Sequence, residues 1–183
     1  MDQERQDDSG SSPRTGMRQE PNTADNGRPL PVITDLAELI ELLDEAPAEG
    51  GYYVRWSRGP AVDLVDDHGG SSRDTLTGVR LPGLSANPLA VEDWWGDRSR
   101  RLWAARRLYD YRHLHRDGAR PWVLVGQVCG RGPDNEPLVR CRRPIAWVSE
   151  AVLAQAQALV EQQSAEGWGP LNRSGADPGP LPA

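Results

Sequence analysis

The apolar residues of this 183-residue chain are concentrated in its middle, and this restricts folding to one segment. Residues 1–29 contain only Met1, Met17 and Ala24 from the apolar set, and residues 166–183 are rich in Gly and Pro. Such stretches bury too little surface to offset the roughly 1–2 kcal/mol of backbone entropy lost on ordering each residue. We therefore predict one compact domain over residues 30–165, held between two disordered tails.

The apolar pattern inside this segment changes between helical and strand periodicity. Apolar residues at helical spacing follow an Asp35 cap and predict a helix over residues 35–45. Residues 52–57 alternate instead, which predicts a half-buried strand with Tyr53, Arg55 and Ser57 on its second face. The other expected elements are a loop over 59–78, strands over 79–86, 122–129, 138–142 and 145–148, and helices over 97–115 and from Ser149 onward.

The order of these elements decides the fold class. Several strands follow one another without a helix between them, so a purely parallel sheet built from strand–helix–strand units is disfavoured. We predict an α+β fold in which helices pack on a mixed or antiparallel sheet.

The composition excludes several classes of enzyme, because all 21 basic residues are Arg. Without lysine there is no Schiff base for pyridoxal phosphate, no phosphate-loop lysine and no kinase strand lysine. The spacing of three His and two Cys matches no structural zinc site, so we expect no metal. No secretory signal or membrane-spanning run is present, so we expect a cytoplasmic protein that does not enter a membrane. Cys129 and Cys141 should then be free thiols, although they could lie opposite each other if their segments form a hairpin.

The charges are divided unevenly along the chain. Residues 30–97 carry 13 acids and 4 Arg, whereas residues 98–143 carry 12 Arg and 4 acids. The fold either pairs these two halves against each other or presents a surface that binds anions.

Four stretches carry a resemblance to a known family: YVRWSRGP at 53–60, LPGLSANPL at 81–89, RLWAARRLYDYRHL at 101–114, and GRGPDNEPLV with PIAWV between 130 and 148. Through them residues 30–160 resemble an actinobacterial protein family known only as a domain of unknown function. This resemblance implies membership of a family but implies no activity.

A second resemblance rests on three residues of separate extended segments. Arg55 lies on the first strand, Ser85 ends the next extended piece, and Glu136 stands where a turn re-enters a strand. This order is similar to the arginine–serine–glutamate class of ADP-ribosyltransferases, although Leu84-Ser85-Ala86 replaces Ser-Thr-Ser and Pro137 follows the glutamate.

The second resemblance implies an enzyme that cleaves the nicotinamide–ribose bond of NAD. Glu136 would be the catalytic glutamate, Ser85 would orient it, and Arg55 would hold the NAD phosphates or ribose. Arg58, Asn87 and Trp95 would be further contacts to the nucleotide; Trp95, with its neighbour Trp94, would supply a wall on which its rings stack.

Simpler interpretations remain open for each of these residues. Arg55 could form an ion pair with an acid such as Asp63 or Asp74, and Glu136 could be a solvated turn residue. The alternative function is a non-catalytic binding or regulatory domain, whose Arg-rich helix near residues 97–115 would dock an acidic partner or a nucleic acid.

Overall fold

The computed structural model describes residues 29–65, 69–74, 76–116 and 118–165. Apart from Pro29, the two stretches that we predicted to be disordered tails lie outside these residues. The helices are α1 (Leu36–Asp44), α2 (Pro60–Asp63), α3 (Arg100–Asp110) and α4 (Glu150–Ala165), with 3-10 turns η1 (Asp93–Trp95) and η2 (Arg112–Leu114). The strands are β1 (Val32–Ile33), β2 (Gly51–Ser57), β3 (Leu84–Ser85), β4 (Asn87–Pro88), β5 (Arg120–Arg131) and β6 (Pro137–Val148).

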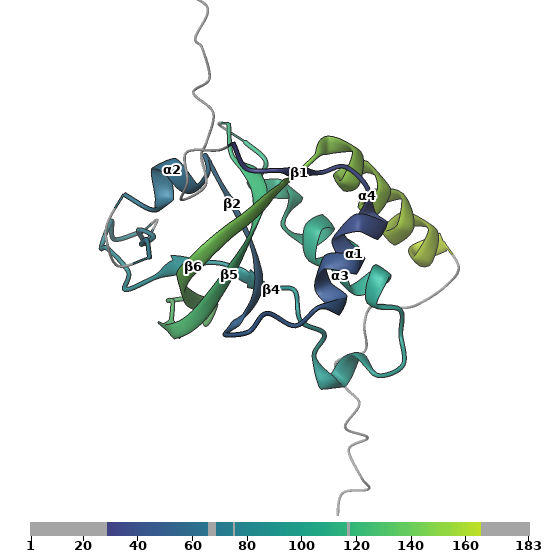
Figure 1. Cartoon of the computed structure of the whole chain (residues 1–183), viewed down its shortest axis with the longest axis horizontal. Coiled ribbons are helices and arrows are strands. Elements are labelled where there is room, and N and C mark those ends of the chain that lie inside the picture. The colour runs from purple at the N-terminus through teal and green to yellow at the C-terminus, as the bar shows by residue number, and fades with distance from the viewer. Residues whose placement is uncertain (1–28, 66–68, 75, 117, 166–183) are drawn as a thin grey trace, which may run out of the picture.

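The strands form one mixed sheet in the order β1-β6-β5-β2-β4, and β3 also pairs with β6. β5 and β6 form a long antiparallel hairpin, β2 adds antiparallel to β5, and β1 adds parallel to the end of β6. The predicted α+β fold with a mixed sheet is therefore confirmed. Figure 1 shows α1, α3 and α4 together on one side of this sheet, with α2 on the other.

The sheet curls because the five-residue segment 84–88 pairs with two different strands. Leu84 of β3 pairs with Val139 of β6, whereas Asn87 of β4 pairs with Val54 of β2. Segment 84–88 therefore touches two strands that β5 separates, and the sheet must bend to bring them within its reach. This bend creates an inner face that α1, α3 and α4 do not cover.

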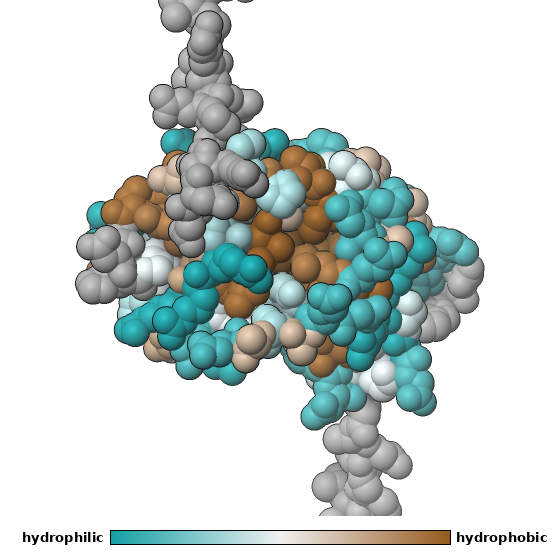
Figure 2. All heavy atoms as spheres, in the orientation of Figure 1, coloured by the Kyte–Doolittle hydropathy of each residue, from teal (hydrophilic) through white to brown (hydrophobic). Residues whose placement is uncertain are grey.

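The two faces of the sheet have separate cores, and the alternation in β2 assigns each side chain to one of them. Tyr52 and Val54 pack with residues of α1, α3 and α4, whereas Tyr53 packs inside the curl with Trp122 and Val139. The alternation predicted for residues 52–57 is thus confirmed. Figure 2 shows apolar side chains where the sheet meets the helices, and mainly hydrophilic ones over the helices themselves.

The helix caps agree with the sequence pattern. Asp35 accepts a hydrogen bond from the Ala37 amide at 2.6 Å, and the Glu38 carboxylate accepts one from the Thr34 amide at 2.9 Å. These reciprocal bonds satisfy amides that the first turn of α1 leaves unpaired. Ser149 likewise accepts from the Val152 amide at 3.4 Å and starts α4.

Four boundaries differ from the prediction. The expected strand over 79–86 is reduced to β3 at Leu84–Ser85, and Arg80 instead pairs with Arg73 in an isolated bridge. The expected helix over 97–115 is shorter, because α3 ends at Asp110 and a 3-10 turn follows Tyr111. The expected break between 142 and 145 is absent, because β6 accommodates Pro144 at register shifts in the β5–β6 ladder. The expected loop over 59–78 begins with α2, whose first residue is a proline in the position that helices tolerate.

The hairpin does not place the two cysteines opposite each other. Cys141 pairs with Gly126, and the structure joins neither Cys129 nor Cys141 in a disulfide. In the part of the chain that the structure describes, no helix has the length and apolar character needed to cross a membrane.

Candidate functional site

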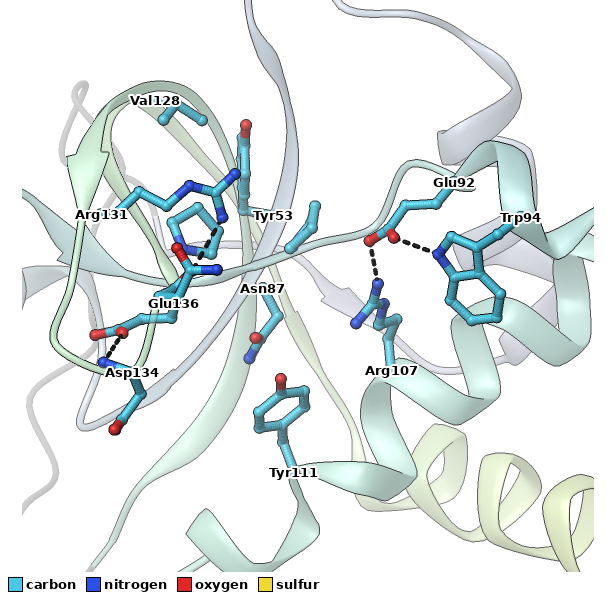
Figure 3. Close-up of a pocket in the computed structure, with 13 residues that line it drawn as sticks. Tyr53, Asn87, Glu92, Trp94, Arg107, Tyr111, Val128, Arg131, Asp134 and Glu136 are labelled. Carbon is cyan, nitrogen blue, oxygen red and sulfur yellow. Dashed lines mark hydrogen bonds and ion pairs between the residues drawn. The ribbon is translucent and has the colours of Figure 1, made fainter. Parts of the chain in front are cut away.

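A cavity of about 670 Å³ lies where the β5–β6 turn faces η1 and the end of α3 (Figure 3). Tyr53, Asn87 and Tyr111 line its middle, Arg131 and Glu136 line one side, and the other side is formed by Glu92, Trp94 and Arg107. The volume falls within the roughly 300–1,000 Å³ typical of small-molecule sites. Aromatic faces and charged groups of both signs therefore share one space.

A second cavity of about 490 Å³ adjoins the first, and we call the two together the joined cavity. Asn87, Tyr111, Asp134 and Glu136 line both. The second cavity contains three of the residues that the sequence singled out, namely Arg55, Ser85 and Glu136. The fold thus brings together side chains from β2, β3 and the turn before β6.

Arg55 is held by a network of hydrogen bonds on the inner face of the sheet. Its Nε and Nη2 donate to the two carboxylate oxygens of Asp63 at 2.7 and 2.9 Å. Its Nη1 donates to Ser72 Oγ at 2.9 Å and to the Ser85 carbonyl at 2.7 Å. The side chains of Arg55 and Asp63 are only 13% and 8% exposed. The simpler interpretation, an ion pair with Asp63, therefore describes this guanidinium.

The same network fixes the segment that carries Ser85. Ser72 Oγ accepts from the Ser85 amide at 2.9 Å while it accepts from Arg55, so both backbone polar groups of Ser85 are tied to this cluster. Ser57 donates to Asp63 and accepts from Trp122 Nε1 at 2.8 Å. Arg55 thus positions the Ser85 backbone, and the half-buried Ser85 side chain lines the cavity.

Glu136 lies at the boundary between the two cavities. Its carboxylate accepts from the Asp134 amide at 3.0 Å, and Figure 3 shows it directed at this amide of its own turn. Arg131, across the same turn, donates from Nη1 to the Asn135 carbonyl at 2.9 Å. The turn therefore presents a carboxylate and a guanidinium at one edge of the joined cavity.

The centre of the joined cavity is formed by aromatic side chains. Figure 3 shows the Tyr111 ring directed at Asn87, with Tyr53 beyond it. Burial raises the pKa of the Tyr53 phenol above its ordinary value of 10.0, because the charged phenolate is poorly solvated there. Tyr53 is therefore a neutral hydrogen-bonding group at physiological pH.

Two of the predicted nucleotide contacts lie elsewhere. Trp95 is 1% exposed in the helix-side core, where its Nε1 donates to the Arg98 and Ser99 carbonyls. Its neighbour Trp94 is 40% exposed and lines the 670 Å³ cavity instead. Arg58 is exposed and is not among the residues that line either cavity.

Sequence reasoning missed several residues that build the site. Ser72 was hidden in the expected loop, and Tyr111 was placed inside a continuous helix. Tyr53 could have been found, because the predicted alternation already places it on the same face as Arg55.

The arginines of α3 are engaged within the molecule. Arg100 pairs with Asp44 at 2.9 Å, and Arg107 pairs with Glu92 at 2.7 Å. Arg106 donates to the Gln163 side chain of α4 at 3.1 Å. Two of these contacts are ion pairs between the basic part of the chain and its acidic part.

A comparison with family models gives one match, over residues 26–169, to a family of unknown function (DUF6098). The chain belongs to the DUF6098 family. The match includes every described strand and helix, so the DUF6098 domain comprises the curled sheet together with α1 to α4. Comparisons with curated proteins and with solved structures gave no match.

Proposed function

We propose that the joined cavity binds a nucleotide and that this chain is an ADP-ribosyltransferase-like enzyme that cleaves the nicotinamide–ribose bond of NAD. One observation carries the proposal: Arg55, Ser85 and Glu136 line one cavity although 81 positions separate the first from the last. Their order along the chain is the one that the resemblance requires. The proposal assumes a reducing cytoplasm, in which Cys129 and Cys141 would stay reduced.

Glu136 has the role nearest to the reaction. Cleavage of the nicotinamide–ribose bond develops positive charge on the ribose, and a carboxylate beside the ribose stabilises that charge. Glu136 lines both cavities, so a ligand that spans them passes its carboxylate. The Asp134 amide holds this carboxylate, so its approach to the ribose requires a side-chain rotation that breaks this bond.

Arg55 and Arg131 would divide the work that the resemblance assigns to a single arginine. Arg55 is committed to Asp63 and positions Ser85, so it acts through the backbone. Arg131 uses Nη1 for a carbonyl, and no carboxylate among the described residues pairs with it. Its remaining N–H groups would form the fork that meets phosphate oxygens. Trp94 and Tyr111 would offer aromatic faces to the rings of the nucleotide.

The experiment measures melting temperature and nicotinamide release with the full chain. NAD at about 100 times its dissociation constant should raise the melting temperature by roughly 5–10 °C. Glu136→Gln should keep this shift and lose nicotinamide release by about 10²–10³-fold. Glu41→Gln, which changes an exposed acid of α1 outside both cavities, should alter neither quantity.

The outcomes separate catalysis from binding. A melting shift without nicotinamide release would mean that the domain binds the nucleotide but does not cleave it. Unchanged release by Glu136→Gln would remove Glu136 from the mechanism. No change of melting temperature with NAD, nicotinamide or ADP-ribose would exclude a nucleotide as the ligand.

A second candidate function is the docking of an acidic partner or a nucleic acid, and the sheet supports it better than α3 does. Arg140, Arg142 and Arg143 are exposed along β6, and none of them pairs with a carboxylate in the described part of the chain. Exposed arginines bind phosphates with a strong dependence on salt. Replacement of all three by Gln should abolish retention on single-stranded DNA at low salt; absence of retention by the unmodified chain would remove the nucleic-acid version.

A further inference from the structure

A third cavity, of about 320 Å³, lies on the helix side of the sheet and apart from the joined cavity. It is bounded by the end of β2, the C-terminal part of α3 with η2, and the first turns of α4. Trp56 is the one lining residue that it shares with the 490 Å³ cavity, among the residues described. The proposed nucleotide site therefore leaves this cavity unexplained.

Trp56 supplies a buried donor without an acceptor. The residue is 8% exposed, and its indole Nε1 is buried with no hydrogen-bond partner among the described residues, as are Arg107 Nε and Gln163 Nε2. By contrast, Nε1 of Trp95, Trp103 and Trp122 donates to a carbonyl or a hydroxyl within the protein. Buried donors are nearly always paired, so an acceptor beyond the described residues would satisfy the Trp56 indole.

Arg112 supplies a cation that no carboxylate neutralises. Its Nη1 donates to the Tyr109 carbonyl at 2.9 Å, and its guanidinium carbon lies 3.6 Å from the centroid of the Tyr109 ring. No acid among the described residues lies within ion-pair distance of it. Stacking on Tyr109 therefore holds the guanidinium at the cavity and leaves further N–H groups for a ligand.

One acceptor at the cavity is engaged by a neighbouring side chain. Glu150 is the acid that lines the cavity, and its Oε1 lies 3.2 Å from Nε2 of His115. Leu108, Leu153 and Ala154 add an apolar surface beside these polar groups. The Trp56 indole and the Arg112 guanidinium thus border a partly apolar space of small-ligand size.

From these observations we propose that this cavity binds a small organic carboxylate with an apolar body about the size of one ring. The carboxylate accepts hydrogen bonds from the Trp56 indole, which has no partner among the described residues, and from the Arg112 N–H groups other than the one that donates to Tyr109. The apolar body lies against the leucines and the aromatic rings. This assignment is independent of the nucleotide proposal.

The indole N–H resonances test the site directly. The full chain is labelled with ¹⁵N, the Trp56 indole signal is assigned from its disappearance in Trp56→Phe, and benzoate is the probe. We expect benzoate to move this signal downfield in a saturable way, with a dissociation constant on the order of 1 mM. Benzamide, which has the same shape without the charge, should produce a much smaller shift.

Two matched variants distinguish this cavity from its neighbour. Arg112→Gln should weaken benzoate binding about 10-fold or more, because it removes a charge-assisted hydrogen bond. Arg73→Gln alters a charge on the other cavity that Trp56 lines and should leave the affinity unchanged. The unaltered signals of the other indoles report that both variants remain folded.

Four results would overturn the proposal. Equal shifts with benzoate and benzamide would mean that the cavity recognises the apolar ring and not the carboxylate. A saturable shift with inorganic phosphate and none with benzoate would exclude the carboxylate. Equal losses of benzoate affinity in Arg112→Gln and Arg73→Gln would mean that the ligand binds in the 490 Å³ cavity instead. A Trp56 indole signal that benzoate does not shift would exclude the site.

Discussion

The buried ion pair between Arg55 and Asp63 gives the sharpest test of how the inner face of the sheet is held together. Replacing Asp63 by Asn preserves the shape of the side chain but removes its charge. Asp63 receives the Nε and Nη2 bonds of 2.7 and 2.9 Å on two separate oxygens, whereas Asn has one acceptor oxygen, so this two-oxygen pairing is lost. The side-chain amide nitrogen of Asn is itself a donor, so it would face the N–H groups of Arg55 or the hydroxyl of Ser57 where a carboxylate oxygen accepted their hydrogen bonds.

The magnitude follows from burial. Both side chains are less than one-seventh exposed, so the variant leaves a cation that water cannot solvate well. Removal of one partner from such a pair costs about 3–5 kcal/mol. This is a large part of the roughly 5–15 kcal/mol by which a domain is stable. With a urea slope of about 2 kcal/mol/M, the midpoint should fall by roughly 1.5–2.5 M.

The assay is urea unfolding followed by tryptophan fluorescence, and the chain offers a control. Asp44 pairs with Arg100 at 2.9 Å, but these side chains are 56% and 66% exposed. Asp44→Asn should therefore cost less than about 1 kcal/mol. The double variant Arg55→Met with Asp63→Leu should recover most of the lost stability, because it removes both charges together.

A loss below about 1 kcal/mol in Asp63→Asn would refute the reasoning. It would mean that solvent reaches the guanidinium, and Arg55 would again be free to grip a ligand. The alternative role of Arg131 would then lose its justification.

Three further predictions concern packing and pH. Gly126→Ala should destabilise the protein by about 1–3 kcal/mol, because the new Cβ would lie 2.2 Å from a Val139 methyl group. Gly130→Ala should be tolerated, because no atom lies closer than 3.9 Å to its new Cβ, and urea midpoints check both variants. Because its pKa is raised, the Tyr53 phenol stays protonated in the folded protein at a pH where it ionises in the unfolded chain. The stability that this group contributes should therefore be complete below pH 10.0 and decrease above it, and Tyr53→Phe should lessen this decrease when melting is followed against pH. The lowered pKa of Asp35, caused first by the helix amide that it caps, means that its contribution is present above pH 3.8 and is lost as the pH falls below it; Asp35→Asn should flatten this part of the acid melting curve.

The elements that the sequence predicted well are those whose signals are local. Asp35 begins α1 because its side chain bonds an amide two residues away, and the alternation of β2 assigns its faces without further information. Pro144 misled the prediction, since the bulge that admits a proline depends on the register of the partner strand. The end of α3 was also missed, because η2 is stabilised by contacts that periodicity does not describe.

Three residues of the candidate site were predicted from the sequence, but their contacts were not. Arg55, Ser85 and Glu136 were selected from their order and do line one cavity. That Asp63 neutralises Arg55 depends on α2, a four-residue helix inside an expected loop. The Trp56 donor could not be predicted at all, because an unpaired hydrogen-bond donor is a property of the packed structure.

The parallel pairing of β1 with the end of β6 has a consequence for how the protein folds as it is made. Val32 pairs with Trp147, and the Leu36 amide donates to the Gln155 side chain at 2.8 Å across 119 positions of sequence. Synthesis runs from the N-terminus, so α1 and β1 leave the ribosome long before these partners exist. The hairpin of β5 and β6 closes through contacts near in sequence, and α1 also packs on α3, whereas β1 can pair only after the end of β6 has emerged. A chain stalled before residue 147 would therefore leave β1 without its partner strand for as long as the stall lasts.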